Sequence, residues 1–435
     1  MLMLNYKAMV GAIILSIMIS GLVIRSRKPQ IPVWSIMAFT SVITVVSGLV
    51  KFDEFESVID LDVIFFLIGM FSIVSLAESS GLLNSIAAWF IGLFRSTKSL
   101  IYASSLLFGL LAAVTMNDTV AFIGPPIAYT IAKALGVNPT TIFLLLAYSL
   151  TIGSIMTPIG NPQNMLIAQR SGMTAPFLKF TLYLAIPTIV NLLVTPFLVT
   201  KFHKVRYNDT KRVLIIPHEQ LKDRRNAILA GIGIVSSISL LIINDFLELM
   251  NLPHVTRRGF IPFIIASALY MLSSEPRKIL AGVDWGTIIF FTTMFISMEG
   301  VWRSHVLDAL LNLFLPGKHH DISVDIVSIT VLSLLGSQLI SNVPFTRLII
   351  EYMRNLGYTG GDEFAWITLA MATTIAGNLT LLGAASNIII IEYLESRMNT
   401  TITFKEFLEL GLIVTIANTL IYLAFLEFEF YIILH

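Results

Sequence analysis

The stretch Thr157-Pro-Ile-Gly-Asn-Pro-Gln-Asn164 interrupts one of the most apolar parts of the chain, and a second polar break, Ala376-Gly-Asn-Leu-Thr-Leu-Leu-Gly-Ala-Ala-Ser-Asn387, lies at the matching place in the other half. Each break combines helix-destabilising Gly or Pro with Asn, Thr or Ser side chains. The hydrocarbon core of a bilayer tolerates such backbone only where it is buried in protein or lines a cavity. Paired broken helices, predicted here over 139–168 and 363–394, are typical of a transporter's binding site.

The composition is that of a membrane protein. Hydrophobic residues make up 56% of the 435 residues and charged residues 13%, and the mean hydropathy is +0.83. A span takes about 20 largely apolar residues, and we find such stretches at 4–24, 31–50, 61–79, 139–168, 174–200, 226–244, 258–273, 284–300, 363–394 and 405–431. We therefore expect an all-α polytopic protein with about ten transmembrane helices.

Several classes of function are disfavoured. A net charge of +1 gives no reason to expect a nucleic-acid partner, and the lack of Cys excludes disulfides and thiolate metal sites. The seven His residues are expected in loops or at the terminus, so we predict no embedded metal centre and no cofactor beyond a coupling sodium ion or proton. The sequence contains no G-x-x-x-x-G-K-[ST] motif, so any ATPase drive would come from a separate subunit. An intramembrane hydrolase would need a nucleophile and base within the helices, and we expect no enzyme.

The basic residues predict the orientation in the cell membrane. Arg25, Arg27 and Lys28 follow the first apolar segment instead of preceding it, which indicates a retained helix and not a cleaved signal peptide. The positive-inside rule places this cluster in the cytoplasm, together with the densely basic linker 201–225. Both termini are then expected outside. Arg257 and Arg258 are the exception, because they also fall outside.

Matching polar landmarks indicate an internal duplication. Asp62 and Asp284 are 222 residues apart, Asn117 and Asn342 are 225 apart, and the pairs Gly160/Gly383 and Asn164/Asn387 are both 223 apart. We predict a first repeat over 1–200 and a second over 226–435. Five crossings per repeat is an odd number, so the second repeat would enter the membrane inverted. The alternative is that two polytopic halves look alike by composition alone.

Two further segments, 99–135 and 322–356, are too short for two comfortable spans, and each has a polar turn at its centre. We interpret them as re-entrant hairpins with tips at 115–119 and 341–344. Asn, Asp, Ser and Thr at such tips cap the N–H groups that begin the next helix, and those N–H groups also favour an anion. Two short complete spans would be the alternative.

These four motifs, in this order, resemble the ion transporter superfamily that includes the arsenical pump membrane protein (ArsB), plant silicon effluxers and NhaD-type sodium/proton antiporters. The resemblance covers nearly the whole chain. It implies a two-fold inverted-repeat fold, often dimeric, that moves small anions or weak-acid hydroxides with proton or sodium coupling. The more distant divalent-anion/sodium symporters carry Ser-Asn-Thr at both tips, whereas this chain has Met116-Asn-Asp-Thr119 and Ser341-Asn-Val-Pro344, which argues against dicarboxylate transport.

Asp118 and Arg347 are the charged candidates. A carboxyl group at a hairpin tip in mid-membrane is costly, and when desolvated it can take up and release a proton, as coupling requires. The alternative for Asp118 is a simple helix cap. Arg347 lies one turn beyond the second tip and could bind an anion through two hydrogen bonds. It could instead snorkel or pair with an acid such as Glu351.

Neutral side chains of the tips and breaks complete the predicted site. Their oxygens and amides suit sodium or a polyhydroxylated solute, although packing between helices is the alternative for each. The set is Asn117, Thr119, Thr157, Gly160, Asn161, Asn164, Ser341, Asn342, Asn378, Thr380, Gly383, Ser386 and Asn387, with sodium assigned to Asn117, Asn164, Asn342 and Asn387. Glu78, Glu299 and Glu392 fall near predicted segment ends, so we expect them to be structural.

The sequence therefore predicts a secondary active transporter of a small inorganic anion or metalloid hydroxide, such as arsenite or silicate, with alternating access around the two tips. The expected partners are the lipid bilayer, the solute and a second copy of the chain. A sodium/proton antiporter and a sodium-coupled symporter of dicarboxylate, sulfate or phosphate are the alternatives. A passive channel would be distinguished by its inability to accumulate solute.

Overall fold

The computed structural model describes residues 2–27, 31–94, 96–205, 217–319, 321–381, 383–398 and 400–434. Within these ranges every regular element is a helix. Eight helices are long and apolar enough to cross a membrane, namely α1, α4, α6, α8 with η2, α10, α12, α17 and α21. The prediction of an all-α polytopic membrane protein is confirmed.

The described elements of the first half run from α1 to α10. They are α1 (Leu2–Arg27), α2 (Val33–Val46), η1 (Phe52–Glu54), α3 (Phe55–Val58), α4 (Leu61–Ser79), α5 (Leu82–Gly92), α6 (Thr97–Thr115), α7 (Asn117–Leu135), α8 (Pro139–Gly153), η2 (Ser154–Met156), α9 (Pro162–Arg170) and α10 (Pro176–Phe202). The short helix α11 (Pro217–Gln220) follows in the linker, part of which lies outside the described residues.

The described elements of the second half repeat this order. They are α12 (Arg224–Leu249), α13 (Phe260–Leu272), α14 (Pro276–Ala281), α15 (Trp285–Ser304), α16 (Asp308–Phe314), α17 (Ile322–Ile340), α18 (Asn342–Asn355), α19 (Glu363–Ile375), η3 (Ala376–Asn378), α20 (Ala385–Met398) and α21 (Phe404–Leu434). Two of the predicted spans, 31–50 and 258–273, form the shorter apolar helices α2 and α13. The first arms of both predicted hairpins, α6 and α17, are themselves long enough to span.

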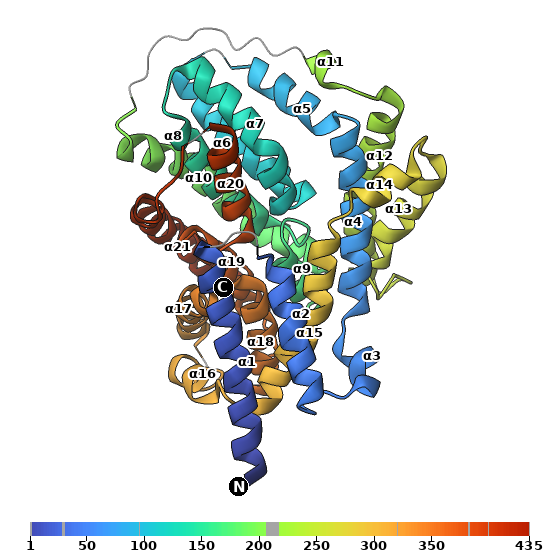
Figure 1. Ribbon diagram of the computed structural model, residues 1–435, viewed down its shortest axis with the longest axis vertical. Helices are drawn as coiled ribbons and strands as arrows, with labels where there is room; N and C mark the ends of the chain where they lie inside the picture. The colour runs from blue at the N-terminus through green and yellow to red at the C-terminus, as the bar shows by residue number, and fades with distance from the viewer. Residues whose placement is uncertain are drawn as a thin grey trace.

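The helices of the two halves pack in reciprocal pairs. Helix α2 packs against α15 and α13 against α4, and likewise α9 packs against α18 and α20 against α7. Equivalent helices of the two halves therefore make equivalent contacts with the opposite half, as in a two-fold arrangement. In Figure 1, α1 begins at the bottom, whereas α11 of the linker lies at the top. The division at 1–200, 201–225 and 226–435, and the inversion of the second repeat, stay predictions.

Each hairpin turns at a single residue with an unusual backbone. Met116 separates α6 from α7 with φ 75° and ψ 145°, and Ser341 separates α17 from α18 with φ 73° and ψ 157°. This region of backbone space is essentially restricted to Gly, and other residues there cost about 1–3 kcal/mol. The strain recurs at equivalent places, so the surrounding structure holds both tips in this conformation.

The first tip is held against the first break. Gly153 at the end of α8 lies against Gly109 of α6, where an added Cβ would come within 2.2 Å of the Gly109 Cα. This close approach brings the tip to the interrupted part of the helix. There the Asn117 N–H donates to the Gly160 carbonyl oxygen at 2.8 Å.

Two asparagines satisfy the backbone carbonyl groups that the breaks leave without helical partners. Asn164 Nδ2 donates to the carbonyl oxygens of Ser154, Ile155 and Thr157 at 3.1, 3.1 and 3.2 Å. Asn387 Nδ2 donates to those of Gly377 and Thr380 at 2.8 and 3.3 Å. Gly377 and Thr380 each lie 223 residues after Ser154 and Thr157. The same side chain therefore performs the same task in both halves.

The two broken helices meet at the centre of the molecule, where α19 packs against α9 and η2. The hydroxyl group of Thr374 on α19 accepts hydrogen bonds from Asn161 Nδ2 and Gln163 Nε2, at 3.2 and 3.3 Å. It donates to Asn164 Oδ1 at 3.1 Å. Polar groups thus join the two halves at the depth of the breaks.

Candidate substrate-binding cavity

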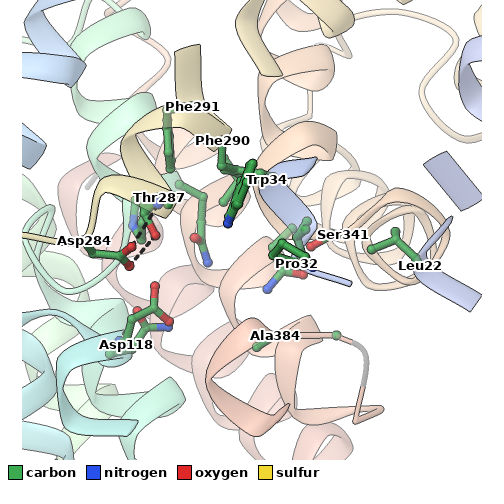
Figure 2. A pocket seen from close by; sticks show the side chains of 18 of the residues that line it. Leu22, Pro32, Trp34, Asp118, Asp284, Thr287, Phe290, Phe291, Ser341 and Ala384 are labelled. Carbon is green, nitrogen blue, oxygen red and sulfur yellow. Dashed lines mark hydrogen bonds between the residues drawn. The ribbon is translucent and has the colours of Figure 1, made fainter. Parts of the chain in front are cut away.

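A cavity of about 320 Å³ lies between the two hairpin tips (Figure 2). The first residues of α7, α9, α15 and α18 contribute to its walls, so several helix N-termini reach it. Helix N-termini favour negatively charged or oxygen-rich groups. The lining residues are Leu22, Arg25, Pro32, Val33, Trp34, Asn117, Asp118, Phe122, Pro162, Gln163, Asp284, Gly286, Thr287, Phe290, Phe291, Ser341, Asn342, Val343, Gly383 and Ala384.

The carboxyl group of Asp118 is directed into this cavity and does not cap the helix (Figure 2). The side chain of the preceding residue, the first of α7, accepts a hydrogen bond from one of the free N–H groups of this turn, from the Asp118 N–H to Asn117 Oδ1 at 2.9 Å. At the equivalent place of the second half, Val343 lines the cavity. The acid is therefore a feature of one half only.

Asp284, the N-cap of α15, is the second acid of the cavity. Its Oδ1 accepts from the Thr287 N–H at 3.0 Å and its Oδ2 from the Thr287 hydroxyl group at 2.6 Å. In Figure 2 the carboxyl groups of Asp118 and Asp284 lie near each other, and their charges interact. Two acids thus share one end of the cavity.

Arg25 is the one basic residue among the described residues that line the cavity. Its Nε is buried and has no hydrogen-bond partner in the described part of the chain. Aromatic side chains, including Trp34, Phe122 and Phe290, form much of the remaining wall. The cavity combines apolar sides with a few polar groups, as small-molecule sites do.

The structure divides the predicted site residues into two groups. Asn117, Asp118, Ser341, Asn342 and Gly383 line the cavity, and Thr119 lines a second, smaller cavity of about 70 Å³. The other predicted residues line neither. Their roles in binding stay predictions.

Several of that second group hold the breaks together. Thr157 Oγ1 donates to the Ala113 carbonyl oxygen at 2.6 Å and accepts from the Gly160 N–H at 3.0 Å. Asn161 Oδ1 caps α9 through the Asn164 N–H at 2.9 Å. In the second half, Thr380 Oγ1 donates to Gln338 Oε1 at 2.8 Å.

The second tip and the second break contain buried oxygens without hydrogen-bond partners among the described residues. They are Asn342 Oδ1, Asn378 Oδ1, Ser386 Oγ and Asn387 Oδ1. In the first half, by contrast, Asn117 Oδ1 and Asn164 Oδ1 both accept hydrogen bonds. The capacity to bind a further donor or cation is therefore concentrated in the second half.

Arg347 belongs to a buried ion-pair network and does not line the cavity. Its Nη1 lies 2.6 Å from Glu351 Oε1, and its Nη2 lies 3.2 Å from Glu299 Oε2. The network continues from Glu351 through Arg170 to Asp60, and from Glu299 through Arg303 to Glu54. These contacts favour the pairing alternative for Arg347 over direct binding of an anion.

Sequence reasoning did not assign several lining residues to the site. Asp284 was recognisable only as a landmark of the duplication, and Arg25 only as part of a topology signal. Gln163 stands between two predicted site residues, which was a usable indication. Trp34 and Phe290 gave no signal, because apolar side chains are ordinary in membrane helices.

A helical fold with paired breaks around a central cavity defines a multi-pass membrane transporter. The chain belongs to the citrate transporter family, whose sequence model matches residues 13–376. It is accordingly a transporter and not an enzyme.

Individual relatives agree with this assignment. An uncharacterised transporter of Mycobacterium tuberculosis is 24% identical over 404 residues, which cover 91% of this chain and 92% of that protein. A Dictyostelium discoideum protein named as the transporter arsB is 22% identical over 484 residues, covering 86% and 83%. The crystal structure of the Alcanivorax borkumensis YdaH transporter is similar in fold, with a TM-score of 0.51 and 13% identity over 83% of this chain and 84% of that one. The resemblance to the arsenical pump superfamily is confirmed.

Proposed function

We propose that the protein is a proton-coupled secondary transporter of a small oxygen-rich solute, either an inorganic oxyanion or a metalloid hydroxide such as arsenite or silicate. Asp118 is the coupling residue. The observation that carries this proposal is the presence of two carboxyl groups, Asp118 and Asp284, in a cavity whose described lining offers a single basic side chain, Arg25.

Charge balance explains why solute and proton would move together. Two unit charges 4 Å apart repel by about 4 kcal/mol at an effective dielectric constant of 20. An anion would therefore bind weakly beside two ionised acids. Protonation of Asp118 removes one of the negative charges, so binding of an anionic solute and proton uptake favour each other.

The polar groups of the cavity suit a solute with several oxygen atoms. Asn117 and Asn342 offer amide groups from the two tips, and Ser341 and Thr287 offer hydroxyl groups. Because the chain contains no Cys, arsenite would be recognised through its hydroxyl groups and not by thiolate bonds. Citrate is a necessary comparison compound, since the matching family is described as citrate transporters.

Flux into proteoliposomes tests the proposal. Arsenite, silicate, phosphate, sulfate and citrate would be supplied singly, with an imposed proton gradient, a sodium gradient or neither. We expect uphill uptake of an oxyanion or metalloid hydroxide that depends on the proton gradient alone. Accumulation that requires sodium only, or equilibration without accumulation, would contradict it.

Sodium/proton antiport is the second candidate. The unpartnered oxygens of Asn342, Asn378, Ser386 and Asn387 are neutral ligands of the kind that hard cations prefer. This function would show as proton efflux that sodium alone drives, in vesicles without any of the five solutes.

A further inference from the structure

The second cavity lies on the other side of the two acids. Its volume is about 70 Å³, and Asp118, Phe122 and Asp284 line both cavities. The two carboxyl groups therefore stand at the partition between a larger chamber and a smaller one. The smaller chamber is large enough to hold water, since a site for one water molecule needs only about 10–15 Å³.

Glu78 is at the far side of the smaller chamber. It lies at the end of α4, and its side chain lines the chamber while being exposed. The linker is attached at this point, because the Lys222 N–H donates to the Ser80 carbonyl oxygen at 2.9 Å. Lys222 is also close enough for its charge to act on Glu78. The chamber thus extends from the acid pair to the linker face of the molecule.

The chamber contains other polar groups but is narrow and partly apolar. Phe71, Val74 and Phe122 form apolar walls. Ser75 Oγ is occupied by a hydrogen bond to the Ile279 carbonyl oxygen at 3.0 Å. Among its described lining residues, Glu78, Asp118 and Asp284 are the ones with a carboxyl group.

We propose that Glu78 is a proton relay, which exchanges protons between the linker-side solution and Asp118 through water in the smaller chamber, while the solute uses the larger one. The inference rests on the proposed proton coupling and adds a route that does not pass the solute. Glu78 was expected from the sequence to be structural.

The transfer begins when a hydronium ion at the linker face gives a proton to the Glu78 carboxylate and becomes water. That O–H bond then breaks as a water chain passes a proton to Asp118, where a new O–H bond forms and Glu78 returns to its charged state. Asp284 is held by Thr287 in two hydrogen bonds, and its carboxyl group interacts with that of Asp118. The other charges facing this path are Lys222 beside Glu78 and Arg25 in the larger cavity.

Glu78→Gln tests the relay in proteoliposomes loaded with the pH dye pyranine, with whichever of arsenite, silicate, phosphate, sulfate or citrate the wild type accumulates. We expect proton influx during net uptake to fall at least ten-fold. Exchange of labelled for unlabelled solute, which needs no net proton movement, should keep the wild-type rate. Glu78→Asp should restore part of the proton flux. The matched control is Glu56→Gln, because Glu56 is an exposed acid on α3, away from both cavities.

The outcomes separate the two proposals. Wild-type proton flux in Glu78→Gln, with a coupled wild type, overturns the relay and leaves the proposed function intact. Equal loss of exchange and proton flux assigns Glu78 a structural role and also overturns the relay. If the wild type moves no protons with any of the five solutes, the proposed function itself fails.

Discussion

At the scale of single residues, Asn117 and Asp118 have different roles, although the sequence alone left open whether Asp118 caps the helix or carries a proton. Asn117 provides the hydrogen bond to the start of α7, and the neighbouring carboxyl group faces the cavity. An acid in that position is costly inside a membrane unless it has a function. Substitution can therefore test whether Asp118 carries a proton or only caps α7.

Asp118→Asn should leave expression and thermal stability close to the wild type, since no capping hydrogen bond is lost. It should abolish gradient-driven accumulation and flatten the pH dependence of uptake, because an amide cannot gain and lose a proton. Asn117→Ala is the contrasting variant, and we expect it to lower stability by about 1 kcal/mol through the lost hydrogen bond to the Asp118 N–H. If Asp118→Asn still concentrates solute with the wild-type pH profile, coupling must reside elsewhere.

Ser341 tests the strain at the tips. Its backbone conformation is one that Gly adopts without cost, and its side chain makes no capping hydrogen bond. Ser341→Gly should therefore raise the free energy of unfolding by about 1 kcal/mol, after the entropy cost of Gly is subtracted. Ser341→Ala also removes the hydroxyl group but keeps the Cβ. It should bring no such gain in thermal unfolding, and equal stability of the two variants would show that the tip is unstrained.

At the scale of elements, each broken helix has backbone carbonyl groups at its break that lack a helical donor. One amide side chain per break replaces the missing helical donors. Unsatisfied buried carbonyl groups would otherwise destabilise the fold. The polar breaks thus have a structural role that is compatible with a nearby site.

Asn164→Ala and Asn387→Ala should each destabilise the protein by about 1–3 kcal/mol, measured by thermal unfolding in detergent. Asn164→Ala should be the more severe, because Asn164 makes more hydrogen bonds and also accepts one from Thr374. If these residues also contact solute or ion, apparent affinity should fall about ten-fold, the equivalent of about 1.4 kcal/mol. If stability falls while affinity is unchanged, the two asparagines stabilise the breaks and do not contact solute or ion.

At the scale of the whole molecule, the ion-pair network connects elements from both halves. Arg170 on α9 joins Asp60 before α4 to Glu351 on α18, and Arg347 joins α18 to Glu299 on α15. Removing one partner of a buried pair is far more costly than losing an exposed one. Arg347 and Arg25 therefore make a matched pair of tests.

Arg347→Gln should lower stability by about 3–5 kcal/mol, with little effect on the solute affinity of the protein that remains folded. Arg25→Gln should have the opposite pattern, because Arg25 lines the cavity and its Nε is buried without a described partner. We expect near-wild-type thermal stability and weaker binding of phosphate or arsenate by isothermal calorimetry. If anion binding is weaker in Arg347→Gln but not in Arg25→Gln, the anion is bound by Arg347 and not by Arg25.

The orientation can be tested at the chain ends. In Figure 1 the start of α1 and the linker helix α11 lie at opposite ends of the molecule, and we predict that the linker end faces the cytoplasm. A reporter active only in the cytoplasm should give no signal after His435 and a strong signal when inserted in the linker. A strong signal at His435 would contradict the inverted repeat.

Local chemistry let the sequence alone determine the broken helices, the hairpin tips and the spacing of the duplication. Gly, Pro and amide side chains within apolar stretches have few explanations in a membrane, so Asn164 and Asn387 could be recognised without knowledge of their neighbours. Tertiary structure decided which polar groups face a cavity. Arg347 proved to be paired with Glu299 and Glu351, and Asp284 proved to stand beside Asp118. Such pairings depend on how helices distant in the chain pack together, and no local pattern records that.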